Sequence, residues 1–163
     1  MSARLPGSPR ERLLAALAVA LLIGSALLFW DASSRRTAQQ AGAEALSAAR
    51  DAIPAILSYQ PATAEKDLTA AARDRLTGKF LDDYSQLITT VVAPDAKRKG
   101  ITASAKVPAA AVVSAGADHA VVLAYVDQTT AVGKEPPTRS NTSVRVSLDN
   151  VGGRWLISGF DRI

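Results

Sequence analysis

The chain has 163 residues, room for one modest domain beside a terminal segment. It has no cysteine, which excludes disulfides and thiolate metal sites, and its single histidine excludes a paired-histidine metal site. The formal net charge is +4, of which three arginines and one glutamate in residues 1–12 contribute +2. The remaining excess is too sparse for a nucleic-acid-binding face, so no nucleic-acid partner is expected.

An uncharged apolar run covers Leu13–Trp30. At about 1.5 Å per residue it would reach roughly 27 Å as a helix, close to the hydrocarbon thickness of a bilayer. The run predicts a single transmembrane helix, with Trp30 at the interface. The basic tail of residues 1–12 predicts a cytoplasmic N-terminus and an extracytoplasmic domain over residues 31–163, although Arg35 and Arg36 weaken that bias.

A cleaved signal peptide is the alternative interpretation of this run. The small residues Ala32 and Ser34 would offer a cleavage site, but the run is longer than the usual signal core, and bulky residues crowd the site. The sequence therefore favours an uncleaved anchor in the cell membrane.

Small residues recur every four positions within the apolar run, at Ala16, Ala20 and Gly24. Such a face lets membrane helices approach closely, and it is a candidate surface for packing against a partner's membrane helix. The plainer interpretation is that the whole chain is rich in alanine.

Two helices are expected after the anchor. Residues 37–53 carry alanines at helical spacing, with a kink or restart expected at Pro54 and an end by Pro61. Thr63 is a candidate N-cap for a second helix reaching about Leu76, with acidic residues in its first turn.

A third helix is predicted to begin at Thr77 and to fade at Pro94, and the helical half of the domain to end near residue 99. It has the strongest amphipathic pattern in the chain, so we expect it to be the helix that packs on the sheet. The residues of this stripe are Phe80, Tyr84, Leu87, Ile88 and Val91. The basic run Lys97-Arg98-Lys99 is interpreted as a solvated end.

Residues 100–163 have the pattern of strands. Four are expected, the second of them central because it is apolar on both faces. Breaker residues separate them, including a loop over residues 132–137 and a turn at Gly152-Gly153. The strands span about 101–114, 119–130, 144–149 and 154–163. About three helices followed by four sequential antiparallel strands predict an α+β domain whose curved sheet encloses a cone-shaped cavity.

Four motifs follow the N-terminal anchor in order: TVVAPDAKRKG at Thr90–Gly100, AVVLAYVDQTT at Ala120–Thr130, RVSL at Arg145–Leu148 and GGRWLISGFDRI at Gly152–Ile163. This ordered combination resembles the actinobacterial Mce-associated membrane proteins. The resemblance covers nearly the whole chain. It implies a cone-shaped domain of the SnoaL-like, nuclear-transport-factor type held outside the cytoplasmic membrane. It also implies an accessory role beside Mce complexes, which import lipids or sterols.

Some domains of this fold are enzymes, and these need a general acid and a general base positioned inside the cone-shaped cavity. Tyr125 and Asp127 would share one strand face, opposite Val126, and are the best polar pair for a cavity. Asp127 is favoured instead as an acceptor for backbone N–H groups at the strand end. The other polar candidates are Tyr59, Tyr84 and His119. No role is assigned to Tyr59, whereas Tyr84 is interpreted as a core residue and His119 as a solvated turn residue. We expect no catalytic set, no metal, no cofactor and no enzyme.

Three functions follow from these expectations. The first is a non-catalytic, membrane-anchored accessory or stabilising subunit of an Mce lipid or sterol transport complex, with the bilayer and Mce proteins as partners. The second is a lipid- or sterol-binding module that uses the cone. The third is a scaffold subunit of another envelope assembly, such as a type IV secretion system.

Overall fold

The computed structural model describes residues 37–163, of which Ala38–Ile163 form one compact unit. The predicted basic tail, the transmembrane run Leu13–Trp30 and its small-residue face at Ala16, Ala20 and Gly24 lie outside the described residues. Across residues 37–163, no helix combines the length and the apolar character needed to cross a bilayer.

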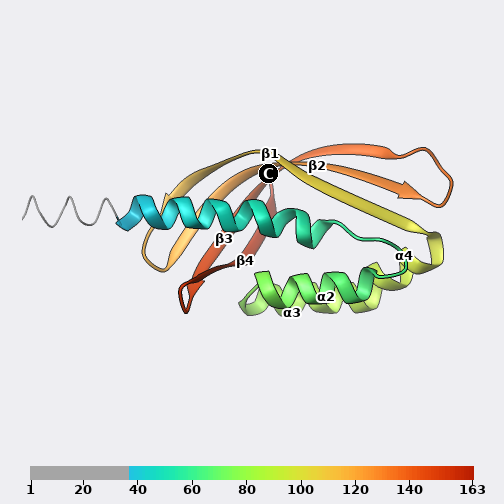
Figure 1. Ribbon diagram of the computed structural model, residues 1–163, viewed down its shortest axis with the longest axis horizontal. Helices are drawn as coiled ribbons and strands as arrows, with labels where there is room; N and C mark the ends of the chain where they lie inside the picture. Colours follow the sequence, from blue (N-terminus) through green and yellow to red (C-terminus); the bar gives the residue numbers. More distant parts are fainter. Residues whose placement is uncertain (1–36) are drawn as a thin grey trace, which may run out of the picture. The chain divides into compact units, whose positions relative to one another are not determined.

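The first described helix covers residues 37–57 and lies across one face of the sheet (Figure 1). The sequence predicts a kink or a restart at Pro54, but the helix runs through this residue without interruption, so the restart is wrong. Proline removes one N–H from the helix ladder, but buried side chains on both sides of it, Ala52, Ile53 and Ile56, hold this segment in place.

The second helix, α2, spans Ala64–Arg75 with Thr63 at its N-cap position, as predicted. The Thr63 side chain makes no capping hydrogen bond. Glu65 and Asp67 lie in the first turn, where carboxylates complement the helix dipole.

The third predicted helix is a continuous helical arm in three parts. It comprises α3 (Gly78–Leu87), the π-helical turn η1 (Ile88–Val92) and α4 (Ala93–Lys99). It does not fade at Pro94, because this proline lies in the first turn of α4, where its missing N–H is tolerated. Gly100, with φ 65°, ends the arm in the left-handed conformation that favours glycine.

The four strands form one antiparallel sheet in the order β1-β2-β3-β4. Their bounds are Ile101–Ala115, His119–Val132, Thr138–Val151 and Arg154–Arg162. The four strands, the interior position of the second and the turns between them are therefore confirmed, but β3 begins at Thr138, earlier than the expected start near residue 144. The β1–β2 and β3–β4 turns lie towards the end where the 37–57 helix begins, and the β2–β3 loop lies at the opposite end beside α4 (Figure 1).

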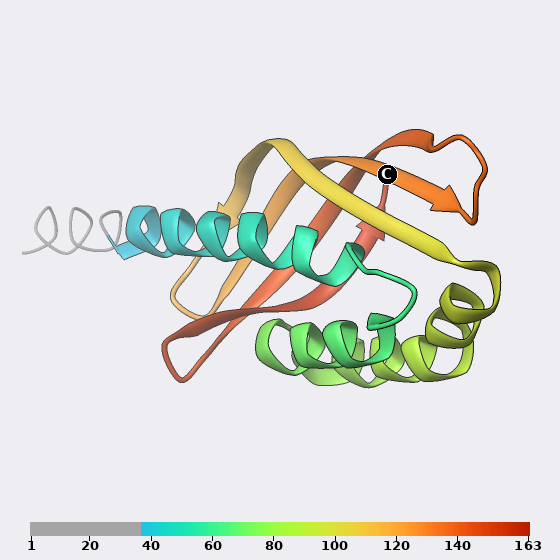
Figure 2. The same cartoon turned by 45° about the vertical axis from the view of Figure 1, so that its right-hand side comes forward.

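The 37–57 helix, and not the third helix, is the one whose buried face covers the sheet (Figure 2). Its buried alanines join one core cluster with small residues of the strands, including Ala105, Ala120 and Ala124. No residue of α3 is fully buried, and α3 meets the edge strand β4 through stacked Phe80 and Phe160 rings 6.4 Å apart. The buried helix residues are Ala41, Ala45, Ala49, Ala52, Ile53 and Ile56.

The inner face of the sheet is filled. Val122, Val146 and Ile157, from three strands, have no exposed surface and belong to the same core cluster. The domain is therefore a curved sheet closed by a packed helix, and its polar residues lie elsewhere.

Candidate functional site

Alternation along β2 assigns the predicted polar pair to the outer face of the sheet. Ala124 and Val126 are buried under the helix, whereas Tyr125 and Asp127 are exposed on the opposite face. The two share one face, as predicted from the strand period. That face is not the one the helix covers, so neither residue lines a cavity between helix and sheet.

Strand register places polar residues from three strands beside Asp127. Lys106 of β1 lies opposite Asp127, and Asp127 lies opposite Asn141 of β3. The next row along is Ser104, Thr129 and Arg139, in the same strand order. These two rows border a hollow of about 470 Å³, which we call the outer-face hollow. Its lining residues are Ser104, Lys106, Asp127, Gln128, Thr129, Arg139, Ser140 and Asn141.

One side-chain hydrogen bond links two of the residues that line the hollow. Asn141 Nδ2 donates to Asp127 Oδ1, so within the described residues the partner of the Asp127 carboxylate is an amide side chain and not the backbone N–H group expected from the sequence. Within the described residues, the side chains of Lys106 and Arg139 have no hydrogen bond or ion pair. Two cations and one carboxylate leave the hollow with a formal charge of +1.

The only histidine of the chain lies at another place, at the end of the sheet near the β1–β2 turn. His119 Nδ1 is 2.7 Å from Asp149 Oδ1, and both side chains are about half exposed. An exposed pair at the end of a sheet agrees with the interpretation of His119 as a solvated residue.

Tyr84 and Tyr59 lie on the helix side of the sheet. The Tyr84 hydroxyl donates to the carbonyl of Ile56, in the last turn of the 37–57 helix. Burial, and then the neighbouring Tyr59, raise the pKa of the Tyr84 phenol far above its ordinary value. Burial also raises the pKa of Tyr59, whose backbone pairs with Ala103 through two hydrogen bonds of 2.9 and 3.0 Å. Tyr84 packs against the core, as expected.

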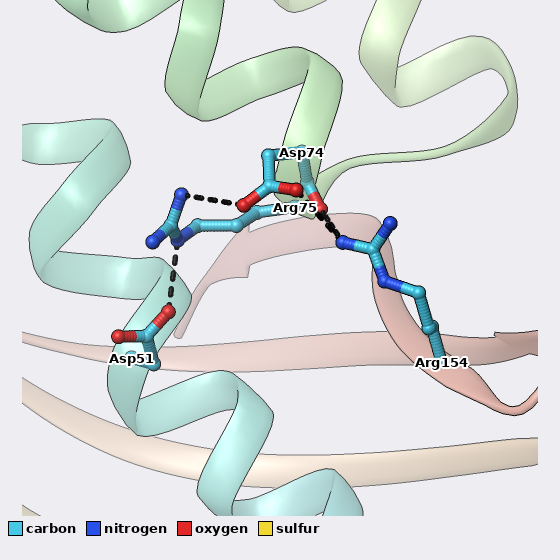
Figure 3. A network of polar contacts seen from close by, with 4 residues as sticks. All are labelled: Asp51, Asp74, Arg75 and Arg154. Atoms are coloured by element: carbon cyan, nitrogen blue, oxygen red, sulfur yellow. Dashed lines mark hydrogen bonds and ion pairs between the residues drawn. The ribbon is translucent and has the colours of Figure 1, made fainter.

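A chain of ion pairs ties the first helix to α2 and β4 (Figure 3). Arg75 Nε donates to Asp51 over 2.9 Å and Arg75 NH1 donates to Asp74 over 3.1 Å, while Arg154 NH2 binds Asp74 Oδ1 over 2.8 Å. Arg154 also binds the Asp74 carbonyl at the C-terminal turn of α2. Apart from Arg75, which is partly buried, these side chains are largely solvent-accessible, and we interpret the network as holding the elements in register. Sequence spacing gave no sign of this network.

The family of the chain can now be stated. The family described as "Uncharacterized protein Rv1363c/MT1408-like" matches residues 12–161. The chain belongs to this family.

Two mycobacterial relatives extend this result. The outer membrane protein Rv1973 of Mycobacterium tuberculosis is 54% identical over 151 residues, which cover 93% of this chain and 94% of that protein. The uncharacterized protein Rv1362c of the same organism is 43% identical over 127 residues, covering 77% of this chain and 57% of that protein. Membership of the family is thus supported along nearly the whole chain.

Solved structures share the fold at low sequence identity. An IcmL-like type IV secretion system protein of Legionella pneumophila has a TM-score of 0.63 at 11% identity and covers 74% of this chain and 91% of that one. The periplasmic domain of DotI has a TM-score of 0.61 at 19% identity, covering 72% and 91%. A periplasmic fragment of TraM has a TM-score of 0.61 at 10% identity, covering 73% and 94%. At these identities, the likeness concerns the fold alone.

Proposed function

We propose that the protein is a non-catalytic, membrane-anchored accessory subunit of an envelope assembly, and specifically of an Mce lipid or sterol transport complex. The observation that carries this proposal is the arrangement of the domain. Its inner face is a filled apolar core, its polar groups lie on an outer face open to contact, and it follows a run suited to cross a membrane.

Relatives and fold neighbours support an envelope role. A relative 54% identical is named an outer membrane protein, and the sequence motifs resemble those of Mce-associated proteins. The apolar run Leu13–Trp30 would hold the domain at the membrane, and the small face at Ala16, Ala20 and Gly24 would pack on a partner's helix.

Affinity purification tests the proposal. The tagged full chain is cross-linked in native membranes and purified, and the partners are identified by mass spectrometry. Mce transport proteins are expected among them. Changing Ala20 and Gly24 to leucine should reduce their recovery while the protein stays in the membrane, because bulky side chains keep helices apart.

Leu22→Ala is the matched control, since Leu22 lies on the opposite side of the same predicted helix. It should leave the recovery unchanged. A cross-linked sample that contains no Mce component contradicts the proposal.

A scaffold role in a secretion system is the second candidate. It is favoured by the fold neighbours, one of which is an IcmL-like type IV secretion system protein. Recovery of secretion components in place of Mce proteins would select it. The lipid-binding alternative is disfavoured by the packing, because a ligand inside the cone would have to displace Val122, Val146 and Ile157.

A further inference from the structure

We propose that the outer-face hollow binds an anionic polyol, that is, a sugar or sugar alcohol that carries a phosphate or a carboxylate. This goes beyond the accessory role, and either proposal can stand without the other. Three features of the hollow support it: two unpaired cations, a hydrogen-bonding centre and an exposed aromatic ring beside it.

The cations provide the anionic part of the recognition. Lys106 and Arg139 enter the hollow from β1 and β3, on either side of β2, and neither has a side-chain partner in the described chain. Arg75 and Arg154, in contrast, are each held by a carboxylate. A guanidinium and an ammonium that face one hollow match the oxygens of a phosphate or carboxylate.

The centre of the hollow offers groups for vicinal hydroxyls. The Asp127 carboxylate accepts one bond from Asn141, which leaves its second oxygen as an acceptor and the Asn141 carbonyl as another. The hydroxyls of Ser104 and Thr129 have no side-chain partner within residues 37–163. Donors and acceptors at this spacing suit a ligand with several hydroxyls better than a bare anion.

Tyr125 supplies the apolar contact that a sugar ring uses. It lies two residues before Asp127 on the same face, about 7 Å along the strand. Its side-chain neighbours across the sheet are the small residues Ala109 and Ser143, so its ring is uncovered and the residue is 54% exposed. The C–H face of a ring could therefore stack on it while the hydroxyls reach the hollow.

The size and place of the hollow also fit. About 470 Å³ lies within the usual range for small-ligand sites. The hollow involves the start of β1 and the strand ends next to the β2–β3 loop, at the end of the domain away from residue 37 (Figure 1). The ligand would thus be presented at the end of the domain where α4 and the β2–β3 loop lie (Figure 1).

Nuclear magnetic resonance of the ¹⁵N-labelled full chain in detergent micelles tests the proposal. The probes are glucose 6-phosphate, glucuronate, glucose and inorganic phosphate. At least one of the two anionic sugars should give saturable amide shifts centred on residues 104–106, 127–129 and 139–141. Which of them binds more tightly distinguishes a phosphate from a carboxylate ligand. Glucose and inorganic phosphate should each bind about tenfold more weakly, because each offers half of the contacts.

Variants assign the binding to the hollow. Lys106→Met with Arg139→Met should weaken the anionic sugar at least about tenfold, and Tyr125→Ala should weaken it several-fold. Lys134→Met, an exposed cation in the β2–β3 loop, is the matched charge control and should leave the affinity unchanged. All these side chains are exposed, so dispersed amide spectra should confirm that each variant is folded.

Three results would overturn the proposal. The first is the absence of a saturable amide shift with either anionic sugar. This would show that the charged residues of the hollow are only a solvent-exposed surface. The second is equal affinity for glucose 6-phosphate and inorganic phosphate, which shows a plain anion patch. The third is a loss of affinity in Lys134→Met as large as in the double variant, which shows general charge attraction.

Discussion

Tyr84 closes the end of the first helix with a single hydrogen bond. The last carbonyls of a helix lack partners within the helix, and the Ile56 carbonyl lies among them. The Tyr84 hydroxyl satisfies it from α3. Because the phenol is largely buried there, ionisation is unfavourable, and the pKa of Tyr84 is raised.

This raised pKa makes stability fall at alkaline pH. The folded state holds the phenolic proton more tightly than the unfolded state, whose ordinary pKa is 10.0. The contribution is therefore complete below about pH 10 and is lost as the pH rises further. Urea unfolding of the full chain in detergent, followed by circular dichroism between about pH 8 and about pH 12, should show this decline.

Tyr84→Phe separates this effect from the titration of other groups. It should cost about 1 kcal/mol at neutral pH, because the Ile56 carbonyl loses its donor, and it should flatten the alkaline decline. Tyr125→Phe is the control, since the exposed Tyr125 hydroxyl has no partner within residues 37–163. An unchanged alkaline slope in Tyr84→Phe would contradict the assignment.

At the scale of elements, the π-helical turn changes which side chains of the third helix face the core. The apolar stripe read from the sequence includes Ile88 and Val91, but Val91 is 50% exposed while Ile88 is fully buried. The extra residue in η1 rotates the side chains that follow it about the helix axis. Ala93 and Ala96 therefore become the buried positions. A pattern counted at 3.6 residues per turn cannot detect this shift.

Two alanine substitutions test which side chains of this segment face the core. Ile88→Ala should destabilise the protein by about 3 kcal/mol, because it opens a cavity in the core. Val91→Ala should change stability by less than about 0.5 kcal/mol. The midpoints of urea unfolding compare the two. Similar losses for both would show that the turn does not form and that the stripe faces the core as a regular α-helix.

The strands were more predictable than the helix packing. Val144, Val146 and Leu148 alternate with polar residues, and a period of two needs no tertiary information. The helix that covers the sheet was misjudged because its buried side chains are mainly alanines, which contribute little to an amphipathic pattern. Those alanines suit the small strand residues beneath them, and that match is visible only in three dimensions.

The candidate site was predictable only in part. Tyr125 and Asp127 were correctly placed on one face, but a strand apolar on both sides does not show which face is open. Asp127 and Asn141 lie seven residues on either side of Lys134, so a hairpin centred on that loop would have paired them. Lys106 joins them through the register of β1, which shifts between Lys106 and Ala109, and sequence patterns do not determine such a shift.

At the scale of the whole molecule, the described residues have a continuous core of their own. Within residues 37–163, the buried cluster extends from Ala41 to Ile157. We therefore expect a chain of residues 37–163 to fold cooperatively on its own. A single urea transition, together with dispersed amide resonances, would confirm this. A broad, non-cooperative loss of circular dichroism would show that the domain depends on residues 1–36.

The meander order of the sheet sets the sequence in which the domain can assemble. Each strand pairs with its neighbour in the chain, so the hairpins can form from local contacts as synthesis proceeds. The 37–57 helix is made first, yet one of its contacts is the bond from Trp155 Nε1 to Glu44, only eight residues before the C-terminus. This contact between the first helix and β4 can therefore form only after β4 has been synthesised.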